Sequence, residues 1–461
     1  MTDGGRDTTP GPSARGLARA VLERVERDGA YAGRALAAAL DRARALSPED
    51  RALATELVYG VLRRRGRLDR ALDALAREGT GNLDLGVRIA MRVAAYQILF
   101  LDRVPAYAAV NDAVEACKAA RGRGVPGFAN ALLRRLSRVG EPPLPDAAVD
   151  PTGYLEAAVG LPAWLAQLLL AELPADQAIA FGDNLVAPSP VTLRANSLRT
   201  TREALCERLA TERPGAALPP SGIAPDAILA RHFEAPAKTA AWRAGLFAVQ
   251  DAGAQIVAEL CGAAAGERIL DACAGNGGKT AHLLALAADR AQVDAMDISP
   301  AKLEEGTRTF RRLGVSSARS VTADLTQPLA DSTPRYHRIL LDAPCSGLGV
   351  LRRHPEALLR RTPDDFAPLA AQQLRMLDMV APALLPGGLL TYAVCTFEKQ
   401  ECEEVVAAFL AGHPGFSLEP ATAASGRVPW ADLMDSSGAV RTWPQRDDAD
   451  AFFAVRLRGR A

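Results

Sequence analysis

Two cysteines in this sequence each come just after an apolar run that is typical of a β-strand. Cys345 lies three residues after Asp342 in the sequence DAPCSG, and Cys395 closes the sequence TYAVC. A single buried cysteine is usually an inert, small apolar side chain. Two cysteines at neighbouring strand ends would share the edge of a parallel sheet where ligands bind. This arrangement therefore favours a reaction that uses thiols.

One reaction that needs such groups is methylation of carbon 5 of cytosine. That carbon is too electron-poor to take a methyl group directly, but a thiolate that adds to carbon 6 makes it nucleophilic. A carboxylic acid near the ring nitrogen, such as Asp342, would stabilise the adduct. A base must then remove the carbon 5 proton so that the thiolate can leave. Methylation of an amino group, by contrast, needs no cysteine.

A glycine-rich turn lies between an apolar strand and an apolar helix further upstream. Residues 267–280 read ERILDACAGNGGKT, and glycine lets a turn approach a ligand that a Cβ atom would exclude. A Walker A loop would need glycine at Cys273, and a dinucleotide-binding loop would need glycine or alanine at Thr280. Neither is present, so we expect a nucleoside cofactor without phosphate, namely S-adenosylmethionine (SAM). An ordinary glycine-rich turn is the alternative.

Acidic residues follow several of the predicted strands. Asp297 closes the sequence VDAMD, 22 residues after Gly275, and a carboxylate there could accept hydrogen bonds from both ribose hydroxyls. Asp324, in TADL, is expected beside the adenine. A single acid at a strand end is more often a helix cap than a ligand. Acids at successive strand ends, beginning with Asp271, favour a binding site.

These side chains must be positioned by a sheet, because strands and helices alternate from Phe247 onward. The pattern predicts a largely parallel, doubly wound α/β sheet of the Rossmann-like kind. We expect strands near 267–271, 292–297, 318–322, 338–342, 388–394 and 452–457, and main helices at 279–287, 301–313, 367–384 and 400–411.

The front of the chain has a different pattern. Residues 14–136 show helical periodicity throughout, and Ser47 followed by Pro48 predicts a helix start. The apolar segment 87–101 predicts a buried helix. Arginines gather at two places that could contact phosphate or could only form a solvated face. They are Arg63, Arg64, Arg65, Arg67 and Arg70, expected on one helix, and Arg121, Arg123, Arg134, Arg135 and Arg138.

The chain is expected to form several domains, because 461 residues are too many for one core. Residues 1–13 predict a disordered tail and residues 14–140 an all-α RNA-binding domain. The segment 141–245 begins as a proline-rich linker and continues as a small α/β RNA-binding subdomain, with a short strand at 191–193 and a helix at 201–209. Residues 246–461 form the predicted SAM-dependent methyltransferase domain.

Charge is distributed unevenly along the chain. Residues 1–140 contain 24 Lys and Arg and 16 Asp and Glu, a net charge of +8, whereas the chain as a whole is neutral. This asymmetry favours a polyanionic partner. No apolar run is long enough to cross a membrane, and the N-terminus has no signal-peptide pattern, so we expect a cytoplasmic protein. The seven cysteines form no C-x-x-C pair, which argues against a metal site.

Several of these stretches resemble a known family. DACAGNGGKT, DAPCSGLG and YAVCTFEKQE are similar to the three signature sequences of bacterial RNA cytosine-5 methyltransferases of the Sun type, with support from residues 249–255 and 450–457. Residues 14–136 resemble the NusB-like helical RNA-binding domain of the subgroup that acts on 16S ribosomal RNA, in the runs LVYGVLR, AAYQILFL and FANALLRR. TLRAN, at 192–196, is similar to the family's linker domain.

The resemblance implies roles for particular residues. Cys395 matches the nucleophile, Cys345 the cysteine that assists product release, and Asp342 the acid that contacts the base. The residues that match the SAM pocket are Cys273, Ala274, Gly275, Asn276, Gly277, Gly278, Lys279, Asp297, Asp324 and Asp342.

The chain departs from the family pattern at two places. Gly275-Asn276 replaces Ala-Pro, which should loosen the loop, and Val394 replaces a threonine before Cys395. We expect a monomer that methylates cytosine in 16S ribosomal RNA. The alternatives are the same chemistry on tRNA or another RNA, and an inactive RNA-binding assembly factor.

Overall fold

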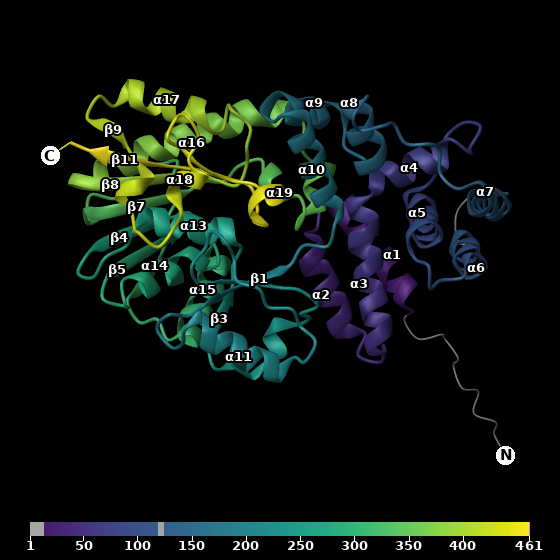
Figure 1. Cartoon of the computed structure of the whole chain (residues 1–461), viewed down its shortest axis with the longest axis horizontal. Coiled ribbons are helices and arrows are strands. Elements are labelled where there is room, and N and C mark those ends of the chain that lie inside the picture. The colour runs from purple at the N-terminus through teal and green to yellow at the C-terminus, as the bar shows by residue number, and fades with distance from the viewer. Residues whose placement is uncertain (1–12, 119–123, 461) are drawn as a thin grey trace, which may run out of the picture. The chain divides into compact units, whose positions relative to one another are not determined.

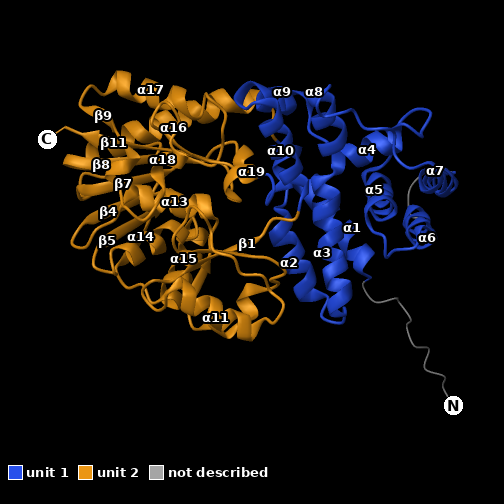
Figure 2. Cartoon of the chain, viewed as in Figure 1, with its two compact units in different colours: residues 1–187, 351–360 blue, residues 188–350, 361–461 orange. Residues whose placement is uncertain are grey.

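The computed structural model describes residues 13–118 and 124–460 (Figure 1). The expected disordered tail, apart from Ser13, and the arginines at 121 and 123 lie outside these residues. The chain forms two compact units, which are coloured separately in Figure 2. The first is Met1–Ala187 with Leu351–Arg360, and the second is Pro188–Val350 with Arg361–Ala461.

The first unit is built from helices, as the periodicity predicts. They are α1 (Ala14–Asp28), α2 (Ala32–Arg42), α3 (Pro48–Arg63), α4 (Arg65–Asp73), α5 (Leu85–Phe100), α6 (Ala106–Cys117), α7 (Val125–Val139), α8 (Pro151–Tyr154), α9 (Ala163–Glu172) and α10 (Ala175–Val186). The predicted start of α3 is confirmed, because the Ser47 hydroxyl accepts a hydrogen bond from the Asp50 amide at 3.1 Å. The expected buried helix is α5, whose middle turns lie in the core of the unit.

The arginines expected on one helix lie on two. Arg64 has a non-helical backbone, with φ −111° and ψ 17°, and it separates α3 from α4. Helical periodicity continues across a short break, which is why the sequence alone did not reveal it. The residues from Arg63 to Arg70 therefore do not form a single basic stripe.

A short segment from late in the sequence belongs to this first unit. Leu359 packs against the helical core. The Glu356 carboxylate accepts a hydrogen bond from the Ala32 amide at 3.2 Å, and the Arg360 guanidinium donates to the Ala30 carbonyl at 3.0 Å. The polypeptide thus leaves the second unit after Val350 and returns to it at Arg361.

The second unit contains a small sheet and a large one. The small sheet has the order β2–β1–β3, formed by β1 (Val191–Ala195), β2 (Ala227–Ala230) and β3 (Phe247–Val249), with all pairs antiparallel. The helix α11 (Arg202–Glu212) packs on it, and the Thr201 hydroxyl caps the start of α11. The short helix α12 (Ala240–Arg243) precedes β3.

The large sheet has eight strands in the order β10–β11–β8–β7–β4–β5–β6, with β9 paired to β11. Its strands are β4 (Arg268–Ala272), β5 (Gln292–Asp297), β6 (Ala318–Thr322), β7 (Tyr336–Asp342), β8 (Leu384–Val394), β9 (Phe416–Glu419), β10 (Val440–Thr442) and β11 (Phe452–Gly459). The pairs among β4 to β8 are parallel, and those that involve β11 are antiparallel. The predicted doubly wound sheet is confirmed. β9 and β10 were not predicted, because they are short strands.

Helices cover both faces of this sheet. They are α13 (Ala252–Cys261), α14 (Gly278–Leu286), α15 (Pro300–Leu313), α16 (Phe366–Val380), α17 (Glu403–Gly412), α18 (Trp430–Leu433) and α19 (Pro444–Asp447). Along β4, Ile269 joins the core formed with α13–α15, whereas Leu270 joins the core formed with α16 and α17. None of the described helices is long and apolar enough to cross a membrane.

Candidate active site

The candidate site lies at the carboxyl ends of the parallel strands. β4 is flanked by β5 on one side and β7 on the other, so the strand order reverses its direction at β4. In open α/β sheets, a ligand binds in the crevice that such a reversal leaves. The loops that follow β4, β5, β7 and β8 all start at this edge, and they carry most of the residues singled out from the sequence.

The glycine-rich loop after β4 is tightly wound. Cys273 has a φ of 65°, in the left-handed region that is unusual for a residue with a side chain. Gly277 has a φ of 74°, and a Cβ atom there would lie 2.5 Å from the Phe310 ring. Gly275 has a φ of 55°, and a Cβ atom there would meet nothing within 4 Å. Glycine at position 275 therefore suits the observed turn, because left-handed backbone costs it little.

The two acids expected at the cofactor have different surroundings. Asp297 is buried at the end of β5, and its carboxylate accepts hydrogen bonds from the Gly275 amide at 2.9 Å and the Ser299 amide at 2.8 Å. It thereby ties the glycine-rich loop to β5. Asp324 is exposed and accepts hydrogen bonds from the amide and hydroxyl of Thr326. These bonds lower the pKa of Asp324 and keep it ionised.

Asp342, at the end of β7, pairs with the lysine of the glycine-rich loop. The Lys279 ammonium donates a hydrogen bond to Asp342 Oδ2 at 2.5 Å. Burial alone would lower the pKa of Lys279, but the charge and hydrogen bond of Asp342 outweigh it and raise that pKa. Lys279 therefore stays cationic beside Asp342, and a thiolate at Cys395 would add to this attraction. No local pattern indicates this pairing, because 63 residues separate the partners.

The two candidate thiols are neighbours. Cys345 Sγ lies 3.3 Å from Cys395 Sγ. The hydrogen bond with Cys395 and burial raise the pKa of Cys345 well above its ordinary value. Cys345 is therefore a neutral thiol in this structure, and it can donate its proton to Cys395. The structure brings together the two cysteines that the strand-end pattern had selected.

A buried network that the sequence analysis missed holds the two cysteine loops together. Glu401 Oε2 accepts hydrogen bonds from the Ser346 amide and the Gln373 amide group, both at 2.8 Å. Gln373 in turn accepts a hydrogen bond from the Tyr392 hydroxyl at 2.9 Å. Arg361 donates to the carbonyls of Ser346 and Cys345. These residues fix the backbone around the thiols. The only sequence signal for such a network is the presence of polar side chains within otherwise apolar stretches.

Asp271, the penultimate residue of β4, is hydrogen-bonded to α14 and is not exposed at the strand end. It is buried, and its Oδ2 accepts a hydrogen bond from the Thr280 hydroxyl at 2.6 Å. Burial raises the pKa of Asp271 to about 7. The carboxyl group therefore connects the end of β4 to the first turn of α14 and can carry a proton near neutral pH.

A second cluster of ionisable side chains lies away from the strand ends. Ligand-type atoms of Asp226, Glu259 and His282 lie within 4.8 Å of one another. Arg427 pairs with both carboxylates, at 2.8 Å and 3.3 Å. Burial, Arg194 and Arg427 lower the pKa of His282 well below its ordinary value. Because two guanidinium groups balance two carboxylates, the charges of the cluster do not call for a cation. The expected lack of a metal site stays a prediction.

Three families match separate parts of the chain. The 16S rRNA methyltransferase RsmB/F family matches residues 260–458, the NusB family matches residues 12–138, and a ferredoxin-like domain of RsmF/B-like methyltransferases matches residues 161–233. The first match contains the strand ends described above. The second contains the helices α1–α6 and all of α7 except its last residue.

Curated relatives match almost the full length. The chain is 31% identical to the probable ribosomal RNA small subunit methyltransferase B of Bacillus subtilis, over 97% of this chain and 98% of that protein. It is 34% identical to ribosomal RNA small subunit methyltransferase B of Vibrio cholerae, over 92% of this chain and 95% of that protein. These identities extend through all three matched regions.

Solved structures share the fold. The alignment with the crystal structure of PH0851 covers 96% of this chain and 98% of that chain, with a TM-score of 0.79 and 22% identity. The alignment with the crystal structure of NSun6 from Pyrococcus horikoshii with SFG covers 66% of this chain and 99% of that chain, with a TM-score of 0.56 and 21% identity. The solved structures support the fold, and the full-length relatives together with the family match establish that the chain belongs to the RsmB/F family and is an rRNA methyltransferase of that family.

Proposed function

We propose that the protein transfers a methyl group from SAM to carbon 5 of a cytosine in 16S rRNA, through a covalent bond between Cys395 and the base. The observation that carries this proposal is the contact between the Cys345 and Cys395 thiols, 3.3 Å apart and on the sheet edge that also carries Asp342. Methylation of a nitrogen or of a ribose would use neither thiol, whereas methylation of carbon 5 uses both.

The reaction begins at Cys395. Its thiolate adds to carbon 6, and the electron pair of the carbon 5–carbon 6 double bond moves toward carbon 5 and the ring nitrogen. Asp342 contacts the base there by a hydrogen bond or proton donation, and Lys279, hydrogen-bonded to Asp342 at 2.5 Å, balances the negative charge of the Asp342 carboxylate. SAM, when bound, supplies the electrophilic methyl group that carbon 5 takes up.

Release reverses the addition. A base removes the proton from carbon 5, the carbon 5–carbon 6 double bond forms again, and the bond from carbon 6 to Cys395 breaks so that sulfur leaves as a thiolate. Cys345 is placed to act at this stage, because its sulfur touches Cys395. Its thiol can pass its proton to the departing Cys395 sulfur, and the Cys345 thiolate formed in this way is the base that accepts the proton from carbon 5.

The glycine-rich loop fits the nucleoside part of SAM. Backbone at Gly275 and Gly278 faces space that a Cβ atom would enter without contact, so a ligand can approach it closely. We assign residues 273–279 and Asp297 to the cofactor. Asp324 is assigned to the adenine end and Asp342 to the boundary between cofactor and base.

The proposed division of labour follows the charge of the chain. Residues 14–140, within a front part of net charge +8, would hold RNA, 141–245 would extend that contact, and 246–461 would carry out the chemistry. A ribosomal RNA substrate would also place the protein in the cytoplasm. The proposal has the enzyme act as a monomer, since one chain carries every residue assigned above.

Bisulfite sequencing of RNA from a deletion strain tests the proposal. One cytosine of 16S rRNA should lose its protection from conversion. The wild-type gene should restore it, and a gene encoding Cys395→Ala should not. Protection lost only in tRNA would assign the chemistry to another RNA, and no change in any RNA would disprove carbon 5 methylation.

A further inference from the structure

Three of the arginines at the junction of α3 and α4 contact other side chains of the first unit. Arg67 pairs with Glu141, Arg64 lies over the Phe100 ring at 4.7 Å, and Arg63 lies over the Tyr59 ring at 5.3 Å. Burial lowers the pKa of Arg63 and of Arg64, which means that both are partly withdrawn from water. These contacts favour a structural role over a phosphate-contacting one. RNA contacts must then be sought elsewhere on the unit.

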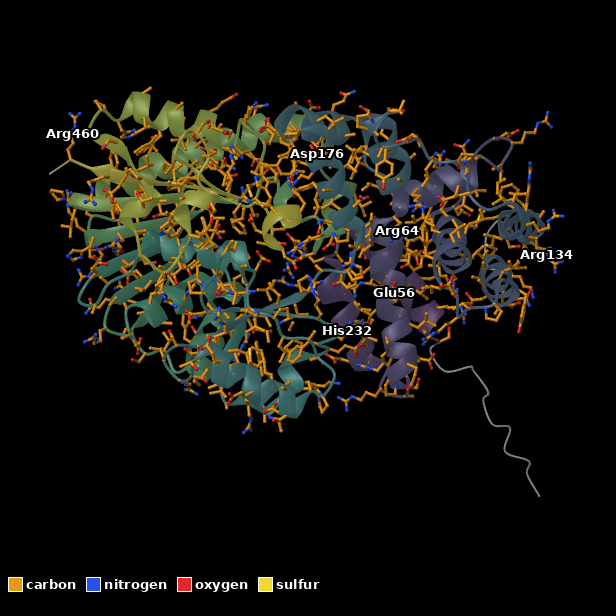
Figure 3. The ribbon with its side chains drawn as sticks, in the orientation of Figure 1. Glu56, Arg64, Arg134, Asp176, His232 and Arg460 are labelled. Carbon is orange, nitrogen blue, oxygen red and sulfur yellow. The ribbon has the colours of Figure 1, made fainter. Side chains whose placement is uncertain are left out.

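The other arginine cluster, on α7, is free. Arg134, Arg135 and Arg138 are exposed, and within the described part of the chain no carboxylate pairs with any of them. Arg134 donates one hydrogen bond, from Nε to the Asn130 side chain at 3.1 Å, which leaves both terminal nitrogens available. Figure 3 shows Arg134 at the outer margin of the helices, whereas Arg64 lies among them.

A groove runs between α6 and α7 beside these arginines. It has a volume of about 610 Å³ and is lined by Ala106, Tyr107, Val110, Asn111, Ala131, Arg134, Ser137 and Arg138. Tyr107 is 71% exposed, although it is a large aromatic side chain. An exposed tyrosine beside unpaired arginines offers a ring for base stacking and charges for phosphate.

The acids of α6 do not oppose this charge. Asp112 pairs with Arg19, and Glu115 pairs with Lys118 at 2.5 Å. Asn111 adds an amide to the wall of the groove, and Ser137, whose hydroxyl donates to the Arg134 carbonyl at 3.0 Å, adds an oxygen that can accept a hydrogen bond from a base edge or a ribose 2′-hydroxyl. The groove is therefore cationic, partly aromatic and supplied with neutral donors and acceptors.

We propose that the α6–α7 groove binds single-stranded RNA, with a base stacked on Tyr107 and phosphates held by Arg134 and Arg138. Base stacking on an aromatic ring requires an unpaired base, which is why a single strand fits better than a duplex. This inference rests on the proposed function for the identity of its RNA. It places the phosphate contacts on α7 and the stacking contact on α6. From the sequence alone, both arginine clusters were candidates for contacting phosphate.

Binding of a short, fluorescein-labelled RNA without internal base pairing to the full-length protein tests the groove. Tyr107→Ala should weaken binding roughly 5- to 150-fold, the range for one lost stack. The double variant Arg134→Glu, Arg138→Glu should reduce the log–log salt slope by about 1.4, because two phosphate contacts to a single strand are lost.

The matched control is Arg44→Glu with Arg77→Glu. Both arginines are exposed, and among the described residues neither has a hydrogen-bond or ion-pair partner. This pair changes the net charge equally and should leave the slope close to that of the wild type. Circular dichroism and thermal melts would establish that all variants fold. The proposal would be overturned if the groove variants had the same RNA affinity and the same salt slope as the control. It would also be overturned if the wild-type protein bound an RNA duplex more tightly than the single strand.

This assay contains no SAM and requires no turnover. Unchanged binding by the groove variants would therefore disprove the RNA groove without affecting the assignment of the methylation chemistry. Conversely, a deletion strain with unchanged 16S rRNA methylation would disprove the proposed function without affecting the binding result.

Discussion

Cys345 Sγ lies 3.3 Å from Cys395 Sγ, although 50 residues separate the two cysteines in the sequence. The contact arises because β7 and β8 are parallel neighbours and each cysteine follows the carboxyl end of its strand. Only one of the two sulfurs can attack a given base, so the pair must divide its work. Separate substitutions can distinguish the two roles.

Replacing Cys395 by alanine should abolish methyl transfer while SAM binding persists. The substitution removes the sulfur that we propose adds to carbon 6, and it leaves the glycine-rich loop and Asp297 in place. Transfer of labelled methyl groups to 16S rRNA, with calorimetry of SAM binding, measures both effects. Substantial remaining turnover would place the nucleophile elsewhere.

Replacing Cys345 by alanine should trap the protein on its RNA. Under the proposed mechanism, attack by Cys395 and methyl transfer remain possible in this variant, but the thiol assigned to release is gone, so the bond to carbon 6 should persist. A denaturing gel should show a protein–RNA adduct that resists heat and detergent. The double variant that also lacks Cys395 should show none, and free RNA with the single variant would contradict the assigned role.

Replacing Asp297 by alanine should weaken SAM binding by roughly 1.5–3 kcal/mol, the size of a hydrogen bond to a charged group. The loss has two sources: the hydrogen bonds to the ribose that we propose for this carboxylate, and its observed bond to the Gly275 amide at 2.9 Å. Asp297→Asn keeps an oxygen for that amide and should lose less. Equal SAM affinity in calorimetry for all three proteins would restrict Asp297 to a structural role.

Asp271 should make stability depend on pH in a particular direction. Burial raises its pKa to about 7 from an ordinary value of 3.8, so the folded protein binds this proton more tightly than the unfolded chain. Its contribution is therefore complete below about pH 4 and is lost as the pH rises through about 7. Between about pH 5 and about pH 8, the free energy of unfolding should fall by an amount of the order of 2 kcal/mol through this group.

Asp271→Asn provides the comparison for this effect. Asparagine cannot ionise, and its side-chain oxygen can still accept the bond from Thr280. Urea unfolding at both pH values should reveal a smaller decrease for the variant than for the wild type. An identical pH dependence in the two proteins would assign the titration to other groups.

Local sequence patterns were sufficient to predict much of the fold of this protein and the strand-end positions of its candidate site residues. Alternating strand and helix signals predicted the doubly wound sheet, because apolar periodicity and turn residues act over a few positions. The same patterns placed Cys345, Cys395, Asp297 and Asp342 at strand ends, and parallel strands bring their carboxyl ends to one edge. The helical front part and the cap at Ser47 followed from equally local signals.

The tertiary structure alone decided which partners these residues have. Lys279 and Asp342 are 63 residues apart, and Glu401 joins Ser346 across 55 residues, so no local pattern could reveal either contact. The arginines of α3 and α4 and those of α7 look alike in the sequence. They differ because Glu141, Phe100 and Tyr59 engage the first group, whereas no carboxylate in the described residues engages the second. Residue type fixes which charges a chain carries, and the packing of distant segments decides which of them remain free to bind.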